Sequence, residues 1–111
     1  MIDNIIQFAI LESIVEPIVF VDTAHIIRYM NPAAIESYQK RGYEDLVDKS
    51  LFDCHNERSK QIIIDTVKEF QSGVNEKFLL VNKENKRVIM RAVRNADGKL
   101  IGYYERFELI V

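Results

Sequence analysis

Cys54 and His55 are the adjacent residues of this chain with the clearest chemical potential. They precede Asn56, a residue suited to begin a helix. A thiol just before a helix N-terminus is favoured as thiolate by the helix dipole, and a histidine can bind haem iron. The pair therefore allows a redox thiol or a haem ligand. The plainer interpretation, which we favour, is a capping Asp53, a small buried cysteine and a histidine bonded to nearby backbone.

Other candidates for catalysis or metal binding are weaker. His25 is far in sequence from Cys54, and no Cys-x-x-Cys or His-x-x-x-His spacing occurs, so we predict no metal site and an exposed His25. Asp22 lies in a turn, where hydrogen bonds to the backbone account for it. We expect every other acid at a helix surface, a cap, a loop or an exposed strand position. The sequence thus predicts a protein that is not an enzyme, and a small isomerase with a carboxylate in an apolar pocket is the weaker alternative.

Composition restricts the classes of partner and compartment. The 111 residues are 48% hydrophobic and 29% charged, which is typical of one globular domain with a single core. The net charge of -2 favours neither nucleic acid nor an anionic membrane, and we interpret Arg87, Arg91 and Arg94 as a solvated strand face. A single cysteine excludes an internal disulfide and fits a reducing compartment. With no secretory signal or apolar span, we predict a cytoplasmic protein.

Residues 1–15 have the pattern of an amphipathic N-terminal helix, and residues 16–111 form the expected main domain. One apolar stripe follows helical spacing, and a second apolar edge makes the helix more hydrophobic than one packing surface requires. The helix either covers its own sheet or pairs with a second copy, and the sequence leaves both open. The stripe consists of Ile2, Ile5, Ile6, Ala9 and Ile10, and the second edge of Phe8, Leu11 and Val15.

The remaining pattern predicts an α+β fold, a five-stranded antiparallel sheet with helices on one face. Asp22 marks the first hairpin turn, Asn31 caps a helix that Gly42 ends, and Asp97-Gly98 makes the last hairpin. Asn56 or Asp53 caps the longest helix. We expect strands at 18–21, 25–30, 76–82, 86–94 and 100–110, helices at 32–41 and 57–71, and one helical turn at 43–47.

These elements, in this order, resemble the PAS domain family over nearly the whole chain. Asp22 lies in the first hairpin turn, Ile26 begins the second strand, and Asn31 caps the next helix in an Asn-x-Ala pattern. The segment AVRNADGKLIGYYE at 92–105 matches the last hairpin of PAS domains. The resemblance implies a sensory or regulatory module, and it does not by itself imply a ligand.

A narrower likeness concerns residues 50–73. This segment resembles a PAS module found after a helical region in some bacterial and archaeal proteins. Those members commonly carry a Cys-His pair followed by two prolines, a lysine and a serine. The present chain keeps Cys54, His55 and Ser59 and lacks both prolines.

The resemblance also implies a pocket between the helices and the inner sheet face. PAS domains hold a cofactor, a metabolite or nothing there, and the expected lining predicts either a small apolar ligand or a filled core. No cofactor is required by the sequence. Flavin is disfavoured, because light-sensing members have Asn-Cys-Arg-Phe-Leu-Gln where this chain has LFDCHN, whereas haem held by Cys54 or His55 stays open. The expected lining is Val19, Val21, Ile35, Tyr38, Leu51, Phe52, Ile62, Ile63, Met90, Ala92, Tyr103 and Phe107.

A module of this kind passes its signal to another protein. We expect a homodimer through the helix at 1–15 and contact with a separate, unidentified signalling partner, unless these residues are a segment of a longer chain.

Overall fold

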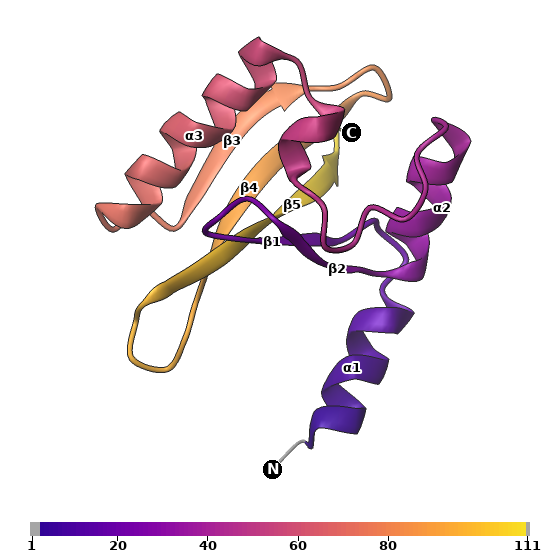
Figure 1. Cartoon of the computed structure of the whole chain (residues 1–111), viewed down its shortest axis with the longest axis horizontal. Helices are drawn as coiled ribbons and strands as arrows, with labels where there is room; N and C mark the ends of the chain where they lie inside the picture. The colour runs from indigo at the N-terminus through magenta and orange to yellow at the C-terminus, as the bar shows by residue number, and fades with distance from the viewer. Residues whose placement is uncertain (1–2, 111) are drawn as a thin grey trace.

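The computed structural model describes residues 3–110 (Figure 1). Nine elements follow one another in the order predicted, helix, hairpin, helices and three strands, and this confirms the α+β fold. They are α1 (Asn4–Ser13), β1 (Val19–Asp22), β2 (Ile27–Met30), α2 (Pro32–Lys40), the 3-10 helix η1 (Leu51–Cys54), α3 (Glu57–Gln71), β3 (Glu76–Val81), β4 (Lys86–Arg94) and β5 (Leu100–Leu109).

The five strands form one antiparallel sheet in the order β2-β1-β5-β4-β3. The last strand of the chain therefore lies in the middle, between β1 and β4, and Tyr103 is in register with both Val21 and Ala92. Gly102, its neighbour, needs to be a glycine, because a Cβ atom there would meet the Val21 carbonyl oxygen and lie 2.6 Å from the ring of Phe20. The centre of the sheet is thus fixed by side-chain size as well as by hydrogen bonds.

The helices α2, η1 and α3 lie along one face of the sheet and enclose the core (Figure 1). The two predicted faces of β4 are seen, because Val88 and Met90 are buried while Arg87 and Arg91 are exposed, although Ile89 on the face of the arginines is also buried. Helix α3 begins at its cap Asn56, which accepts from the Ser59 amide. The main core cluster contains Val21, Ile27, Met30, Ala34, Leu46, Leu51, Ile63, Val67, Phe70, Met90 and Tyr103.

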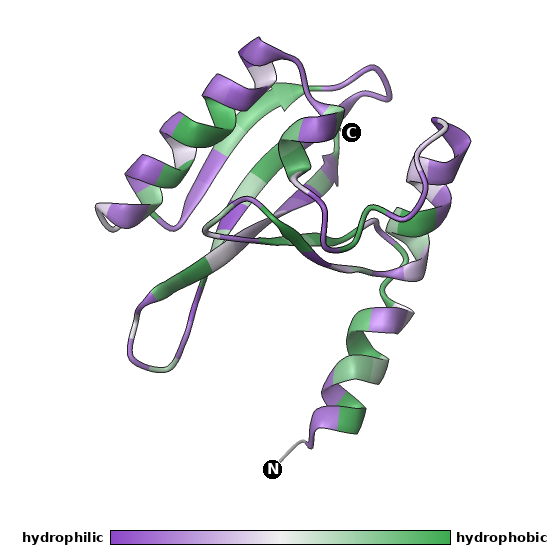
Figure 2. Cartoon of the chain, viewed as in Figure 1, coloured by the Kyte–Doolittle hydropathy of each residue, from purple (hydrophilic) through white to green (hydrophobic). Residues whose placement is uncertain are grey.

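Helix α1 points away from the rest of the molecule (Figures 1 and 2). Asp3 caps it by accepting from the Ile6 amide at 2.9 Å, and the helix ends at Ser13 rather than at 15. None of its residues is buried, and Ile5 is 80% exposed. Ile2, the first member of the predicted stripe, lies outside the described residues. No helix within residues 3–110 combines the length and the hydrophobicity that crossing a bilayer requires.

The predicted helical turn at 43–47 is wrong. This segment is an irregular loop in which Asp45 and, just beyond it, Asp48 have positive φ angles of 54° and 71°. Backbone bonds to the second strand hold the loop, since the Asp48 amide donates to the Ile27 carbonyl and the Ile27 amide donates to the Lys49 carbonyl. These long-range bonds compete with a local helical turn, and the turn forms instead at η1.

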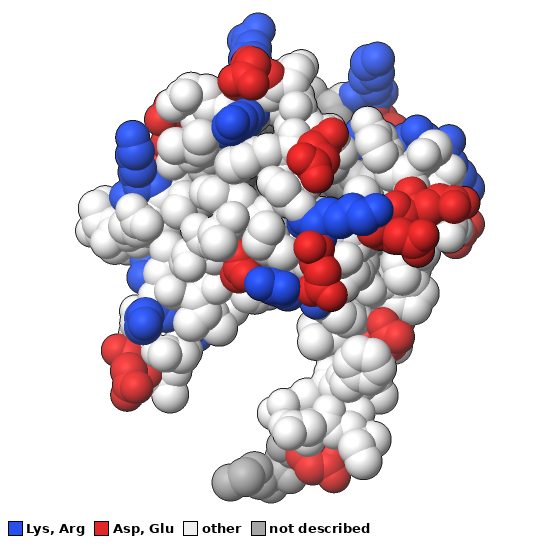
Figure 3. Space-filling view, in the orientation of Figure 1, with Lys and Arg blue, Asp and Glu red and all other residues white. Residues whose placement is uncertain are grey.

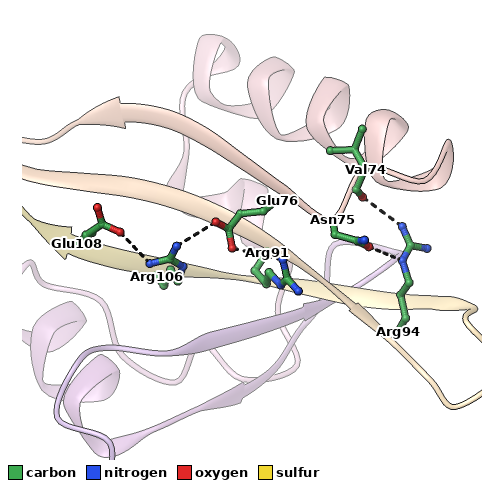
Figure 4. Close-up of polar contacts among 7 residues, drawn as sticks. All are labelled: Val74, Asn75, Glu76, Arg91, Arg94, Arg106 and Glu108. Carbon is green, nitrogen blue, oxygen red and sulfur yellow. Dashed lines mark hydrogen bonds and ion pairs between the residues drawn. The ribbon is translucent and has the colours of Figure 1, made fainter.

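Arg87 and Arg91 of β4 pair with acids on the outer sheet face, and Figure 4 shows the contacts of Arg91. Arg91 pairs with Glu76 at 3.5 Å, Arg106 of β5 lies between Glu76 and Glu108, and Arg87 also pairs with Glu108, at 3.1 Å. The interpretation as a solvated strand face agrees with this arrangement for Arg87 and Arg91. Arg94 differs, since it is half-buried and donates to the Asn75 side chain and to the carbonyl oxygens of Phe70 and Val74 (Figure 4). The far part of the outer face is therefore a charged network of exposed ion pairs, which contribute little to stability singly.

Candidate functional site: a cavity lined by charged residues

A cavity of about 250 Å³ lies between the helices and the sheet. Its lining comes from α2 on one side, from the His55 linker and α3 on another, and from every strand except β2 beneath. Its walls are mostly aliphatic and aromatic, which is the usual character of a small-molecule site. The apolar lining is Pro17, Val19, Ile62, Ile63, Leu79, Leu80, Val88 and Phe107.

Four titratable side chains also line the cavity, Tyr38, Arg41, His55 and Glu105, together with the neutral polar side chains of Ser37, Ser59 and Asn82. Glu105 comes from β5, where it shares a face with Tyr103 and Phe107, and its carboxyl group lies deep among protein atoms. Burial raises the pKa of Glu105 above its usual value, while the nearby His55 and Arg41 lower it. Its carboxyl group forms no hydrogen bond or ion pair within the described part of the chain.

Arg41 directly follows the last turn of α2 and is oriented by two aromatic rings. Its guanidinium carbon lies 5.0 Å from the ring centre of Tyr38 and 5.6 Å from that of Tyr43, within the range of a cation–π contact. Burial, together with the charge of Glu105, raises the pKa of Tyr38 to about 12, so its hydroxyl stays protonated. Arg41 itself is exposed and has no ion pair among residues 3–110.

Cys54 and His55 largely adopt the arrangement that we favoured from the sequence, in which both side chains bond to nearby backbone. His55 Nδ1 lies 2.9 Å from the Leu51 carbonyl oxygen, Cys54 Sγ donates to the same oxygen at 3.2 Å, and both residues are half-buried. Burial raises the pKa of Cys54, which disfavours the thiolate that the sequence left open as an alternative. The helix dipole has less effect than expected since Cys54 ends η1 and α3 begins only after Asn56. The cap is Asn56 and not Asp53.

The residues predicted to line a pocket separate into two groups in the structure. Val19, Tyr38, Ile62, Ile63 and Phe107 line the 250 Å³ cavity. Most of the others fill the core around it, and Ile35 is 42% exposed over a separate depression beside the 43–47 loop. The core group is Val21, Leu51, Met90 and Tyr103, with Phe52 and Ala92 packed against it.

Sequence reasoning missed Arg41 and Glu105. The expectation that every acid other than Asp22 lies at a surface, cap, loop or exposed strand position is wrong for Glu105. A signal was present, because Glu105 has the same parity in its strand as the inward-facing Tyr103 and Phe107. Arg41 lies three residues after Tyr38, a spacing that places both on one helix face.

His25 is also not exposed as predicted. It is half-buried at a positive φ of 64°, stacks on Phe52 with ring centres 4.5 Å apart, and shares a hydrogen bond of 2.8 Å with the Tyr103 hydroxyl. Asp22 has the predicted turn role, since its Oδ1 accepts from the amides of Ala24 and Ile26. His25 and Asp22 do not line the cavity, whereas Tyr103 borders a smaller pocket together with Tyr38 and Glu105.

Asn31 is a buried junction as well as the predicted helix cap. Its Oδ1 accepts from the Ala34 amide at the start of α2 and from the Ile18 amide before β1, both at 2.9 Å. Its Nδ2 donates to the carbonyl oxygens of Ile14, at 3.0 Å, and Glu16, at 2.9 Å, in the segment that follows α1. One side chain thus joins α1, β1 and α2.

The family model described as PAS domain matches residues 8–110. The chain belongs to the PAS domain family. A search of curated proteins found no match. The narrower likeness of the Cys-His segment stays a prediction.

Solved structures agree with this PAS fold. The chain is similar to the PAS domain of a protein from Colwellia psychrerythraea (TM-score 0.67, 14% identity, 97% of this chain and 98% of that one). It is also similar to the Aer2 receptor from Vibrio cholerae, described as a dual PAS-haem oxygen sensor (TM-score 0.61, 19% identity, 86% and 95%). A third match is the PAS domain of the histidine kinase ThkA (TM-score 0.60, 18% identity, 84% and 98%). At these identities the likeness concerns the fold.

PAS domains are generally sensory modules without catalysis of their own. The family match, rather than the positions of the acids, therefore argues against the small-isomerase alternative. In this PAS domain the cavity borders α2, and α2 is capped by the residue that also bonds the segment after α1.

Proposed function

We propose that this PAS domain is a sensory module that binds a small, largely apolar molecule in the 250 Å³ cavity and signals its presence to a second copy through α1. The observation that carries the proposal is that α2 has two contacts: it borders the cavity, and it is joined to α1 through Asn31. A ligand that favours one position of α2 thereby biases the position of α1.

The lining supports a small ligand. The volume of about 250 Å³ is slightly below the range of about 300–1,000 Å³ typical of drug-sized ligands, so the occupant is small. Apolar walls and a few polar groups in the lining favour a molecule with an apolar body and a polar group. Burial of that body provides most of the binding free energy, and the polar end provides orientation.

Exposed apolar surface supports association through α1. Ile5 and Phe8 are 80% and 54% exposed, far more than expected for a helix that packs only on its own domain. Figure 3 shows no Lys or Arg atoms along this helix. A groove of about 410 Å³ continues from it onto the outer sheet face, lined by Leu11, Ile14, Ile18, Phe20, Tyr29, Val93 and Tyr104.

The occupant best suited to this groove is α1 of a second copy. The helix has the same apolar character as the groove, and a two-fold arrangement would bury both copies of each. The ion pairs of Glu76, Arg91, Arg106 and Glu108 occupy the far part of the outer sheet face and favour solvent there. Contact is therefore restricted to the part of the outer face beside α1.

A redox thiol is disfavoured as an alternative, since the raised pKa of Cys54 disfavours thiolate. Haem is the other alternative, because a neutral His55 that donates from Nδ1 leaves Nε2 free to bind iron. The small volume and the charged Arg41 and Glu105 beside His55 fit a smaller molecule better.

Native mass spectrometry and an absorbance scan of the protein purified from its own host test the proposal, together with size-exclusion chromatography and light scattering. We expect a retained mass that a denaturing step releases, no Soret band, and a dimer. A Soret band would support haem instead. Absence of a retained mass, together with failure of a neutral apolar fluorescent probe to bind, would reject the ligand, and a monomer at high concentration would reject the dimer.

A further inference from the structure

Two opposite charges face the same cavity without neutralising each other. Glu105 and Arg41 both line it, yet no nitrogen–oxygen pair between them lies within 4.0 Å, and neither has another ion pair among residues 3–110. By contrast, Arg106 pairs with both Glu76 and Glu108 on the outer sheet face. The acid and the arginine of the cavity line the same space and form no ion pair with each other.

The unpaired carboxyl group is costly. A buried carboxylate without a hydrogen-bond donor loses its hydration and gains nothing in return, and proteins seldom keep such a group without a use. No side-chain oxygen or nitrogen in the described residues is sealed from solvent without a partner, so the Glu105 carboxyl group still has access to open space. It lines the cavity, and a donor that enters there can reach it.

The guanidinium of Arg41 is oriented by its neighbours and can donate to an anionic acceptor. The rings of Tyr38 and Tyr43 lie beside its guanidinium and limit its conformations, which reduces the entropy that binding costs. A guanidinium presents parallel N–H donors that match a carboxylate. The cavity thus has an acceptor for a cation and, separately, donors for an anion.

We propose that the occupant is a small zwitterion with an apolar side chain, whose ammonium group lies at Glu105 and whose carboxylate lies at Arg41. The chemical class is that of an α-amino acid with an aliphatic or aromatic side chain. This inference rests on the proposed function, since it specifies the ligand of the same cavity.

The rest of the lining fits this ligand. Leu79, Val88 and Phe107 form an apolar wall for its side chain, and burying that side chain favours binding. His55 donates from Nδ1 to the Leu51 carbonyl, so its neutral form has an acceptor at Nε2 that can assist Glu105 with the ammonium group.

Isothermal titration calorimetry with L-leucine, L-phenylalanine and matched analogues of leucine tests the assignment. The analogues are 3-methylbutylamine, which lacks the carboxylate, 4-methylpentanoate, which lacks the ammonium group, and the neutral 4-methylpentanamide. We expect at least one of the two zwitterions to bind at least about tenfold more tightly than every analogue, because each charge contributes a charge-assisted hydrogen bond.

Two variants separate the two charges. Glu105→Gln should weaken the zwitterion at least about tenfold and leave 4-methylpentanoate unchanged or tighter, while Arg41→Gln should weaken the zwitterion and leave the amine unchanged or tighter. Glu44→Gln and Arg58→Gln are controls, since both residues are exposed and neither lines this cavity. Circular dichroism of each variant checks that it is folded.

Distinct results overturn the assignment and the proposed function. If 4-methylpentanamide or a neutral fluorescent probe binds as tightly as the zwitterions, the cavity is a ligand site but the charge assignment is wrong. Equal affinity of wild type and both charge variants for a zwitterion would also reject it. If neither the zwitterions nor any neutral probe binds, both the assignment and the ligand-binding function fail.

Discussion

The side-chain amide of Asn31 donates a 3.0 Å hydrogen bond to the carbonyl oxygen of Ile14, so the residue that caps α2 also holds the segment after α1. The two functions use different atoms of one side chain. Oδ1 serves α2 and the start of β1, and Nδ2 serves the segment that links α1 to β1. This division allows the coupling between α1 and α2 to be tested separately from helix capping.

Asn31→Asp should loosen α1 while α2 keeps its cap. The substitution retains Oδ1 but places a second oxygen against the Ile14 and Glu16 carbonyl groups, where two hydrogen bonds are lost and repulsion replaces them. We expect a loss of about 2 kcal/mol in the free energy of unfolding, and faster hydrogen exchange in α1 than in α2.

Asn31→Ala is the comparison for this experiment, because it removes the cap as well and should loosen both helices. Equal exchange in α1 for wild type and Asn31→Asp would contradict the role of Asn31 in coupling.

Glu105→Gln should stabilise the protein at neutral pH in the absence of ligand. Burial raises the pKa of Glu105 above its usual value of 4.5. The folded state therefore binds the proton more strongly than the unfolded state, and wild-type stability falls as pH rises from about 4.5 through the folded pKa. The neutral amide of Glu105→Gln does not ionise and so does not lose this stability. We expect its free energy of unfolding to exceed that of wild type by about 1 kcal/mol at pH 8 and to equal it by pH 4.

Thermal unfolding of wild type and Glu105→Gln from pH 4 to pH 8 measures this difference, with Glu44→Gln as the exposed control. A difference that grows toward pH 4 would show that the Glu105 carboxylate is stabilised by the fold.

Ile5→Glu should dissociate the proposed dimer without unfolding the protomer. Ile5 is 80% exposed, so a charge there costs nothing within one copy, but it would be buried between two. We expect the dimer dissociation constant to rise about tenfold or more in analytical ultracentrifugation. Leu109→Glu is the matched control, since Leu109 is 63% exposed and lies outside the groove beside α1. An equal effect of both substitutions would argue against α1 as the interface.

Gly102→Ala should cost about 3 kcal/mol in the free energy of unfolding. The added Cβ meets the Val21 carbonyl oxygen and the Phe20 ring at the centre of the sheet, where the backbone has little room to move. Chemical denaturation measures the loss. A Phe20→Leu, Gly102→Ala double variant should recover only part of it, because the Val21 backbone contact remains. Full recovery would show that the ring alone requires the glycine.

Much of this PAS fold follows from short stretches of sequence. The Asp22 turn, the Asn31 cap, the stop at Gly42 and the Asp97-Gly98 hairpin depend on residues within a few positions of one another, and all appear as predicted. The alternation in β4 is equally local, because side chains of a strand point alternately to its two faces. The family resemblance rests on the order of these local features.

Tertiary structure alone decided which inward-facing residues fill space and which border a cavity. Met90 and Phe107 both face inward, yet Met90 is fully buried and Phe107 lines the cavity, because the outcome depends on how α2 and α3 pack over the sheet. The raised pKa of Cys54 and the loop at 43–47 likewise depend on contacts between segments distant in sequence.

Glu105 has one property that the sequence predicts and another that only the tertiary structure decides. Its parity in the strand is local and readable from the sequence, and it predicts an inward-facing carboxyl group. That this group has Arg41 and His55 nearby and pairs with neither is a property of three separate elements brought together. The sequence alone determined a PAS domain. The packing of its helices on the sheet decided that the Glu105 carboxyl group borders a cavity, because a cavity forms only between packed elements.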